Sequence, residues 1–149
     1  DLGVGLVPYS PLGRGLLSGR IDATTVADSP FRANDPRFNG DHLSANLNQV
    51  EALTHLARSW DMTTAQVALA WLLSQGDDVV PIPGTRRADR VRENASAMSC
   101  RLTAEELEML NSAVPAGAWE GDRRSFAVPV TARSTPHRDE RQARDTDAR

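Results

Sequence analysis

The chain contains no lysine, one tyrosine and one cysteine. The single thiol, that of Cys100, forms neither an internal disulfide nor a multi-cysteine metal site, which fits a reducing compartment. The longest apolar run, from Val67 to Leu73, is far too short to span a bilayer. No basic segment followed by an apolar stretch predicts a secretory signal. We therefore expect a cytoplasmic protein without a membrane partner.

Positive charge comes from arginine alone and does not exceed the negative charge. Seventeen arginines face 20 acidic residues, which gives a net charge of −3 and a pI near 5.6. This balance argues against a general nucleic-acid binder, because that mode of binding needs surplus positive charge. With no lysine, and with Tyr9 as the only tyrosine, neither a Schiff-base mechanism nor a Tyr–Lys acid pair is complete within the chain.

A hydrophobic content of 40% and a charged content of 25% are typical of a globular domain. The first segment, Val4–Tyr9, is short and apolar, which predicts a buried strand that runs into a glycine-rich turn. Residues 18–45 hold several Gly, Pro and Asn residues and few apolar ones, so we expect a long surface loop. Within this loop, Asp35–Phe38 is either a lid that folds over a bound ligand or an unconstrained surface turn.

Two helices are predicted next. Apolar residues recur every three or four positions over residues 46–59, the stripe of an amphipathic helix. Thr63 and Gln66 form a capping-box pattern that starts the second helix, which stops near Gly76. Because this second helix is apolar nearly all round, we expect it to be packed on several sides, with Trp71 in the core.

A further strand and two more helices complete the body of the chain. Val79–Ile82 predicts another buried strand, and a helix follows over residues 87–97. A second capping box, at Thr103 and Glu106, starts the last helix, which Pro115 ends. Strands that alternate with helices favour parallel strands covered by helices. Two strands make no sheet by themselves, so the pattern indicates part of a larger α/β fold.

The composition changes toward the end of the chain. From Thr131 onward the only apolar residues are alanines, and arginines alternate with acidic residues. Such a segment cannot bury enough apolar surface to offset the entropy that it would lose on ordering. We therefore divide the chain into a folded part, residues 1–126, and a disordered tail, residues 127–149.

The first candidate site is the turn Tyr9–Gly15 (YSPLGRG), directly after the first strand. Its glycines let backbone N–H groups approach a ligand, and such groups in a turn form an anion-binding concavity. Ser10 adds a hydroxyl group, and Arg14 adds a planar guanidinium group suited to phosphate. The alternative is a tight connection in which the glycines serve only the backbone geometry.

The second candidate site is the turn over residues 81–90 (PIPGTRRADR), where a strand leads into the N-terminus of a helix. Unpaired N–H groups and the helix dipole favour an anion there. Three arginines gather at this end: Arg86, Arg87 and Arg90. Cations there are unfavourable for the free helix, so this cluster indicates an anion bound beside it. The alternative is a solvated arginine face that Asp89 and Glu93 balance.

Together the two turns resemble the aldo-keto reductase family, in which YSPLG-x-G follows the seventh strand of a (β/α)8 barrel. The segment ALAWLL…VVPIPGTRR…R…EN, residues 68–94, is similar to the helix, the eighth strand and the following helix of that family. The resemblance covers roughly residues 2–115. It implies an α/β fold, namely a partial TIM barrel of about strands seven and eight with their helices. It also implies an NADP cofactor at the carboxyl ends of the strands, where such barrels place a phosphate site.

The resemblance also implies roles for individual residues. Tyr9 would stack on the nicotinamide, and Arg90 would hold the 2′-phosphate, which favours NADP over NAD. The first turn would line the pyrophosphate with Ser10, Pro11, Leu12, Gly13 and Arg14. The second turn and its helix would lie beside the adenosine ribose with Gly84, Thr85 and Arg86, and would contact the adenine with Glu93 and Asn94. The family often has lysine at the position of Gly84, so one phosphate contact departs from the family pattern.

No residue of the chain matches the Asp, Tyr, Lys and His that the family uses in catalysis, and we assign no catalytic residue. His42, His55 and His137 lie outside that pattern. The resemblance implies hydride transfer to an aldehyde or ketone in a full-length enzyme, whose N-terminal barrel half is missing here; the chain alone is expected to be inactive. The alternatives are a non-catalytic cofactor-binding or partner-docking remnant, and a truncated reading frame that does not fold stably.

Overall fold

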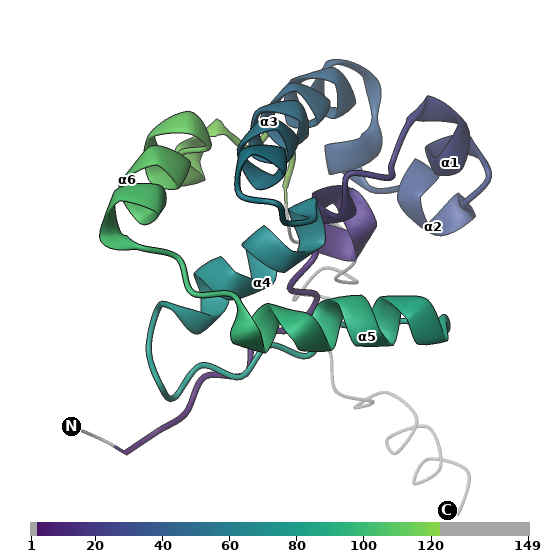
Figure 1. Cartoon of the computed structure of the whole chain (residues 1–149). Helices are drawn as coiled ribbons and strands as arrows, with labels where there is room; N and C mark the ends of the chain where they lie inside the picture. The colour runs from purple at the N-terminus through teal and green to yellow at the C-terminus, as the bar shows by residue number, and fades with distance from the viewer. Residues whose placement is uncertain (1–2, 123–149) are drawn as a thin grey trace, which may run out of the picture.

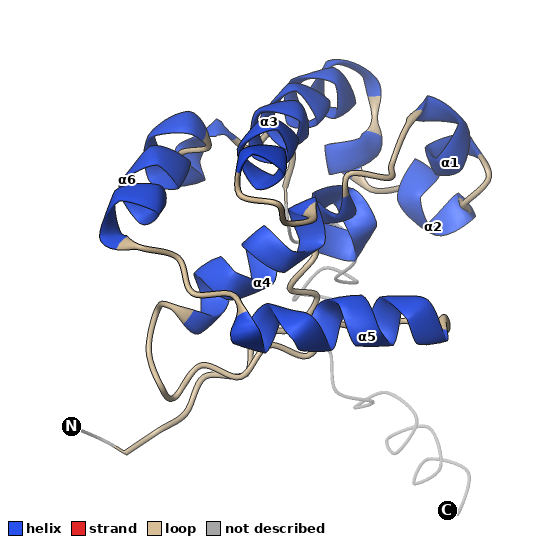
Figure 2. Ribbon diagram, in the orientation of Figure 1, coloured by secondary structure: helices blue, strands red, loops and turns tan. Residues whose placement is uncertain are grey.

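The computed structural model describes residues 3–122, and the predicted tail, 127–149, lies outside them (Figure 1). The described residues are mostly helical (Figure 2). The α-helices are α1 (Ala23–Ala27), α2 (Pro30–Ala33), α3 (Gly40–Ser59), α4 (Thr64–Leu73), α5 (Ala88–Ser96) and α6 (Ala104–Ala113). Short 3₁₀ helices lie before, between and after them: η1 (Gly13–Ser18), η2 (Pro36–Phe38), η3 (Ala97–Ser99) and η4 (Ala116–Ala118).

Helix α4 lies at the centre of this arrangement. The predicted capping box is confirmed: the Thr63 hydroxyl oxygen accepts a hydrogen bond from the Gln66 amide, and the Gln66 side chain accepts one from the Thr63 amide. Six of its ten residues are buried, as expected of a helix that is apolar nearly all round. It packs against α3 on one side and α5 on the other (Figure 1).

The prediction of a long surface loop over residues 18–45 is wrong. Helices α1, α2 and η2 occupy much of this range, and α3 begins at Gly40, six residues before the predicted start. The residues that indicated a loop start helices instead, since Asp22 forms a capping box with Thr25, and Pro30 and Pro36 each stand at a first helical turn. Signals of turns and signals of helix starts use the same residue types, so the sequence pattern did not separate them.

The segment Asp35–Phe38 is neither a lid nor an unconstrained turn. The Phe38 side chain is 1% exposed and belongs to a core cluster with Leu16, Val26 and Val50. A second cluster contains Leu53, Ala57, Val67 and Leu110. Leu17 packs against both clusters, so the helix η1 that follows the first turn is anchored in the core. The three tryptophans pack against the clusters and are only partly buried.

The two predicted strands pair in parallel, as expected, but only once. Within residues 3–122 the pairing is a single bridge between Leu6 and Val79, made by the Leu6 amide to the Asp78 carbonyl at 2.8 Å and the Val80 amide to the Leu6 carbonyl at 2.9 Å. The prediction that both segments are buried is wrong. Five of their apolar residues are more than half exposed: Val4, Leu6, Val7, Val80 and Ile82. No other described segment lies beside the pair as a strand, so only Val79 is covered.

Candidate functional site

The first turn is built from residues with positive φ. The φ angles are 49° at Ser10, 54° at Gly13, 61° at Arg14 and 96° at Gly15. Glycine adopts these angles freely, whereas Ser10 and Arg14 adopt them at a cost. The amides of Gly13 and Gly15 donate to the carbonyls of Ser10 and Leu12, both at 2.9 Å. These two N–H groups therefore close the turn itself, and an anion would have to use other donors there.

Helix α2, which the sequence did not predict, braces this turn. The Arg14 guanidinium lies over the Phe31 ring, 4.7 Å from its centre. The Arg32 Nε donates to the Arg14 carbonyl at 3.2 Å. The contact of a guanidinium group with an aromatic face is favourable, so the two helical residues hold Arg14 in its unusual backbone conformation. A loop free of helix would not supply these contacts.

A cavity of about 520 Å³ opens beside the first turn. Five predicted site residues line it: Tyr9, Ser10, Pro11, Gly13 and Arg14. Apolar and aromatic side chains from α4, α6 and the segment after α6 line much of the rest, among them Trp71, Leu110 and Trp119, and residues of η1, η2 and α3 complete the lining. Tyr9 is 56% exposed and lies at this cavity. The other predicted residues do not line this cavity: Leu12, Gly84, Thr85, Arg86, Arg90, Glu93 and Asn94.

The second turn leads into α5, which begins close to the predicted position. The Arg87 amide donates to the Thr85 hydroxyl at 3.2 Å. The Arg87 guanidinium donates to both carboxylate oxygens of Asp89, at 3.1 and 2.6 Å. These hydrogen bonds lower the pKa of Asp89 from 3.8 to about 2, and they raise the pKa of Arg87. Asp89 thus balances the charge of Arg87, as the alternative of a solvated arginine face expects.

Arg90, one turn into α5, has different surroundings. Its side chain is half-buried, and its Nε is buried with no hydrogen-bond partner among the described residues. A buried donor without an acceptor is unfavourable, so this atom fits an anion such as a phosphate group. Arg86 is exposed just before the helix, and a side chain at Gly84 would meet no atom within 4 Å. The residues present therefore fit a phosphate of a dinucleotide at this turn.

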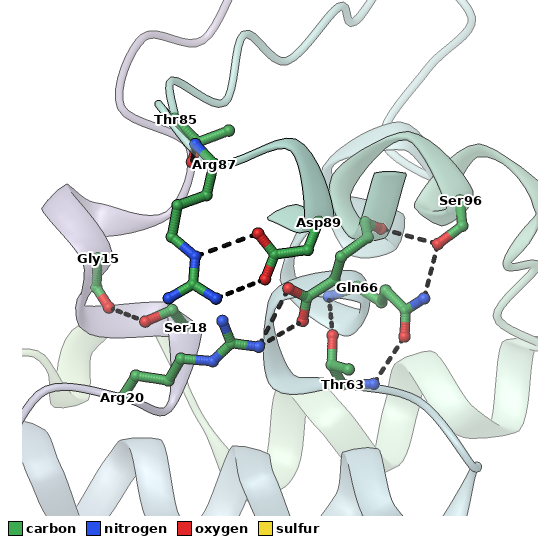
Figure 3. Close-up of polar contacts among 10 residues, drawn as sticks. Gly15, Ser18, Arg20, Thr63, Gln66, Thr85, Arg87, Asp89 and Ser96 are labelled. Carbon is green, nitrogen blue, oxygen red and sulfur yellow. Dashed lines mark hydrogen bonds and ion pairs between the residues drawn. The ribbon is translucent and has the colours of Figure 1, made fainter. Parts of the chain in front are cut away.

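An ion pair links the segment that follows the first turn to the helix that follows the second. The Arg20 Nη2 donates to both carboxylate oxygens of Glu93 at 3.1 Å, and the side chain of Glu93 is 17% exposed. Glu93 and Asp89 lie one turn apart on α5, so the Arg20 and Arg87 side chains meet the same face of that helix (Figure 3). The segment that follows the first turn is thereby held against the helix that follows the second.

Sequence reasoning missed Arg20, because no local pattern relates residues 20 and 93. The pairing depends on where the fold places α5. A separate hydrogen bond, of 2.7 Å from the Gln66 amide group on α4 to the Ser96 hydroxyl, also holds α5 in this place (Figure 3). Asn94, the second predicted adenine contact, is half-buried on the same helix. The only available signal was that Glu93 lies in a family motif.

Other types of site find no support in the described residues. Between residues 3 and 122, no group of three or more His, Cys, Asp or Glu side chains is placed to hold a metal ion. His42 and His55 are exposed on α3, His137 lies outside the described residues, and Cys100 is half-buried. None of the helices in that range is long and apolar enough to cross a bilayer.

Relatives of known sequence match most of this chain. It is 42% identical over 123 residues to "Probable aldo-keto reductase 1" from Glycine max, which covers 83% of this chain and 36% of that protein. It is 37% identical over 124 residues to "Aldo-keto reductase str7" from Strobilurus tenacellus, covering 83% and 37%. The chain thus spans about a third of the length of the curated relatives that it matches.

Solved structures resemble the described fold. A glycerol dehydrogenase, AKR11B4 from Gluconobacter oxydans, matches with a TM-score of 0.62 and 28% identity over 70% of this chain and 32% of its own. The thermostable aldo-keto reductase Tm1743, solved with the inhibitor epalrestat, matches with a TM-score of 0.50 and 32% identity over 74% and 30%. These neighbours support the predicted α/β fold class. The family model "Aldo/keto reductase family" matches residues 1–115, and the chain belongs to that family.

Proposed function

We propose that the chain is the cofactor-binding part of an NADP-dependent aldo-keto reductase, which transfers hydride between NADPH and an aldehyde or ketone in the cytoplasm. The observation that carries the proposal is the link between the segment after the first turn and α5. The Arg20–Glu93 ion pair holds that segment against α5, where the Arg90 Nε is buried and has no hydrogen-bond partner among residues 3–122. One dinucleotide that crosses from the first turn to α5 would meet the predicted residues of both.

The chain's own groups would bind and orient this cofactor, which supplies the hydride when it is bound. Tyr9 lines the cavity and is 56% exposed, which supports the proposed stacking of its ring on the nicotinamide. Arg90 would hold the 2′-phosphate, with Arg86 beside it. Because Asp89 balances the charge of Arg87, that residue would contribute less to the binding of a dianion. The difference between Arg90 and Arg87 is the physical basis on which we propose NADP and not NAD as the cofactor.

The remainder of a (β/α)8 barrel would complete the site. The five exposed apolar residues of the two paired segments are those that neighbouring strands would cover. The chain also spans only about a third of the length of its relatives, which supports the same conclusion. The catalytic Asp, Tyr, Lys and His, and the remaining walls of the site that binds a small carbonyl substrate, would come from this missing part. We therefore expect no reductase turnover from the 149 residues alone.

Calorimetry with NADP⁺ and NAD⁺ tests the proposal. The 149-residue chain should bind NADP⁺ more tightly than NAD⁺, because only NADP⁺ offers a phosphate to the unpaired Arg90 Nε. Arg90→Ala should weaken NADP⁺ binding by about tenfold or more, since hydrogen bonds to charged groups contribute about 1.5–3 kcal/mol. The matched control is Arg58→Ala, which removes an exposed arginine at the end of α3 and should change neither affinity.

The same experiment separates the alternatives. Equal affinity for NADP⁺ and NAD⁺ in the unsubstituted chain would contradict the proposal. A truncated frame that does not fold would exchange its amide hydrogens rapidly with or without NADP⁺, whereas a folded cofactor-binding part would be protected in α4. A non-catalytic remnant would bind NADP⁺ yet stay inactive toward aldehydes after the missing barrel segment of a full-length relative is added.

A further inference from the structure

A buried asparagine joins two segments that are far apart in the chain. Asn46, on α3, is 0% exposed. Its Nδ2 donates to the carbonyl oxygens of Arg37 and Glu120, both at 2.9 Å, and its Oδ1 accepts from the Glu120 amide at 2.9 Å. The carboxamide therefore pairs with both backbone polar groups of Glu120, much as a neighbouring strand would.

The partners of Asn46 are themselves held firmly. The Asp35 carboxylate is fully buried and accepts from the Arg37 amide at 3.0 Å and from its guanidinium at 3.2 and 2.7 Å. Gly121 has a φ of 86°, and a Cβ atom there would lie 2.7 Å from the Arg37 backbone nitrogen. Only glycine permits this approach. We call Asp35, Arg37, Asn46, Glu120 and Gly121 the clasp.

The clasp determines one wall of the cavity beside Tyr9. Arg37, Asn46, Trp119 and Gly121 all line that cavity. Trp119 also packs against the core cluster that contains Phe38, and the next residue, Glu120, is held by Asn46. Release of the Glu120 backbone would free Trp119 and change the shape of the cavity, while the predicted cofactor residues on α5 would stay in place.

We propose that Asn46 is a positioning residue, which holds Trp119 as the wall against which an uncharged, largely apolar ligand lies beside Tyr9. The inference rests on the proposed function only in that this ligand is the carbonyl substrate. Its chemical class follows from the lining, which is mostly apolar and includes three aromatic side chains: Tyr9, Trp71 and Trp119. A ligand carboxylate would lose its hydration at a cost in a cavity whose lining is mostly apolar, which favours an uncharged ligand.

Two substitutions disrupt the clasp independently. Asn46→Ala removes all three hydrogen bonds of the carboxamide, and Gly121→Ala leaves Asn46 intact but forces the segment away from Arg37. Asn48→Ala changes an exposed asparagine on the same helix and serves as the control. Glu120→Ala is a second control, because the clasp uses only the backbone of residue 120.

The readouts are amide hydrogen exchange and calorimetry with 2-naphthaldehyde, its anionic counterpart 2-naphthoate, and NADP⁺. Because the chain has no lysine, it offers the aldehyde no side-chain amine with which to form an imine. The unsubstituted chain should bind 2-naphthaldehyde more tightly than 2-naphthoate. Both clasp variants should exchange the amide of residue 120 faster and bind 2-naphthaldehyde about tenfold more weakly, with NADP⁺ affinity and α4 protection unchanged. The two controls should match the unsubstituted chain in every readout.

Three results would overturn the inference. The first is that the unsubstituted chain fails to bind 2-naphthaldehyde or prefers 2-naphthoate. The second is that the clasp variants exchange faster at residue 120 but keep their affinity for 2-naphthaldehyde. The third is that these variants lose NADP⁺ affinity and α4 protection in parallel, which is the behaviour of a purely structural residue. Equal affinity of the unsubstituted chain for NADP⁺ and NAD⁺ contradicts the proposed function instead, so the two failures are distinguishable.

Discussion

Arg87 and Arg90 lie three positions apart at the start of α5, and their surroundings differ. Arg87 is exposed and paired with Asp89, whereas Arg90 is half-buried and its Nε has no hydrogen-bond partner in the part of the chain that the structure describes. An exposed ion pair contributes little to stability, but a buried donor without an acceptor costs about 1–3 kcal/mol. A bound anion would therefore change the energy of the Arg90 side chain far more than that of Arg87.

The Arg87–Asp89 pair predicts an acid titration. The pKa of Asp89 is about 2 in the folded chain, against an ordinary value of 3.8, so the pair stabilises the folded state above pH 3.8. This contribution is lost as the pH falls through about 2. Carboxyl chemical shifts measured by NMR should show Asp89 still ionised at pH 3, and Arg87→Ala should bring its pKa back toward 3.8. Arg92→Ala, on the same helix, should leave it near 2; a shift as large as that of Arg87→Ala would contradict the assigned cause.

At the scale of elements, the local signals for helix starts were reliable. Both predicted capping boxes, at Thr63 and at Thr103, form with the expected hydrogen bonds. These signals depend on residues three positions apart, so the sequence contains all the information that they need. The helix predicted over 87–97 corresponds to α5 to within one residue at each end.

Thr63→Ala tests the first of these boxes. Loss of the side-chain cap should reduce the free energy of unfolding by about 1 kcal/mol, because the Gln66 amide loses its acceptor. Urea unfolding followed by circular dichroism measures this change. Ser44→Ala, at an exposed position inside α3, should change stability by less than about 0.5 kcal/mol. A Thr63→Ala chain as stable as the unsubstituted one would show that the cap does not stabilise α4.

The features that were missed depend on distant residues. The sequence alone placed Asp35–Phe38 in a loop, because nothing local shows that Phe38 enters the core or that Asn46 reaches Glu120. The pairing of Arg20 with Glu93 was missed for the same reason. The residues of the candidate site that belong to a sequence motif were predicted. The side chains that hold the motif in place belong to no motif, and they were not predicted.

The molecule as a whole leaves apolar surface uncovered. Val4, Leu6 and Val7 on one segment and Val80 and Ile82 on the other are 52–68% exposed, around a single parallel bridge. Strand edges of this kind pair readily with other chains unless a neighbour covers them. The sequence predicted buried strands and also indicated that two strands make no sheet by themselves. The predicted burial was wrong because no neighbouring strands that would cover these segments are among the described residues.

Self-association of the isolated chain follows from this exposed surface. Sedimentation velocity should show an average mass that rises with protein concentration. Replacing Val80 and Ile82 together by threonine, which keeps a branched β-carbon but adds a hydroxyl group, should shift the association to at least about threefold higher concentration. Val91→Thr, at a 54% exposed position on α5, is the control and should have no such effect. A monomer at all concentrations would contradict the expectation.

The bridge between Leu6 and Val79 also has a kinetic consequence. It closes a loop that contains four of the six α-helices, whereas α3 and α4 are joined by only a few residues and contact each other directly. Bringing distant residues together costs chain entropy before any bond rewards it. In refolding, the α3–α4 hairpin should therefore form first, and the rung between residues 6 and 79 should be among the last native contacts to appear and the first to break.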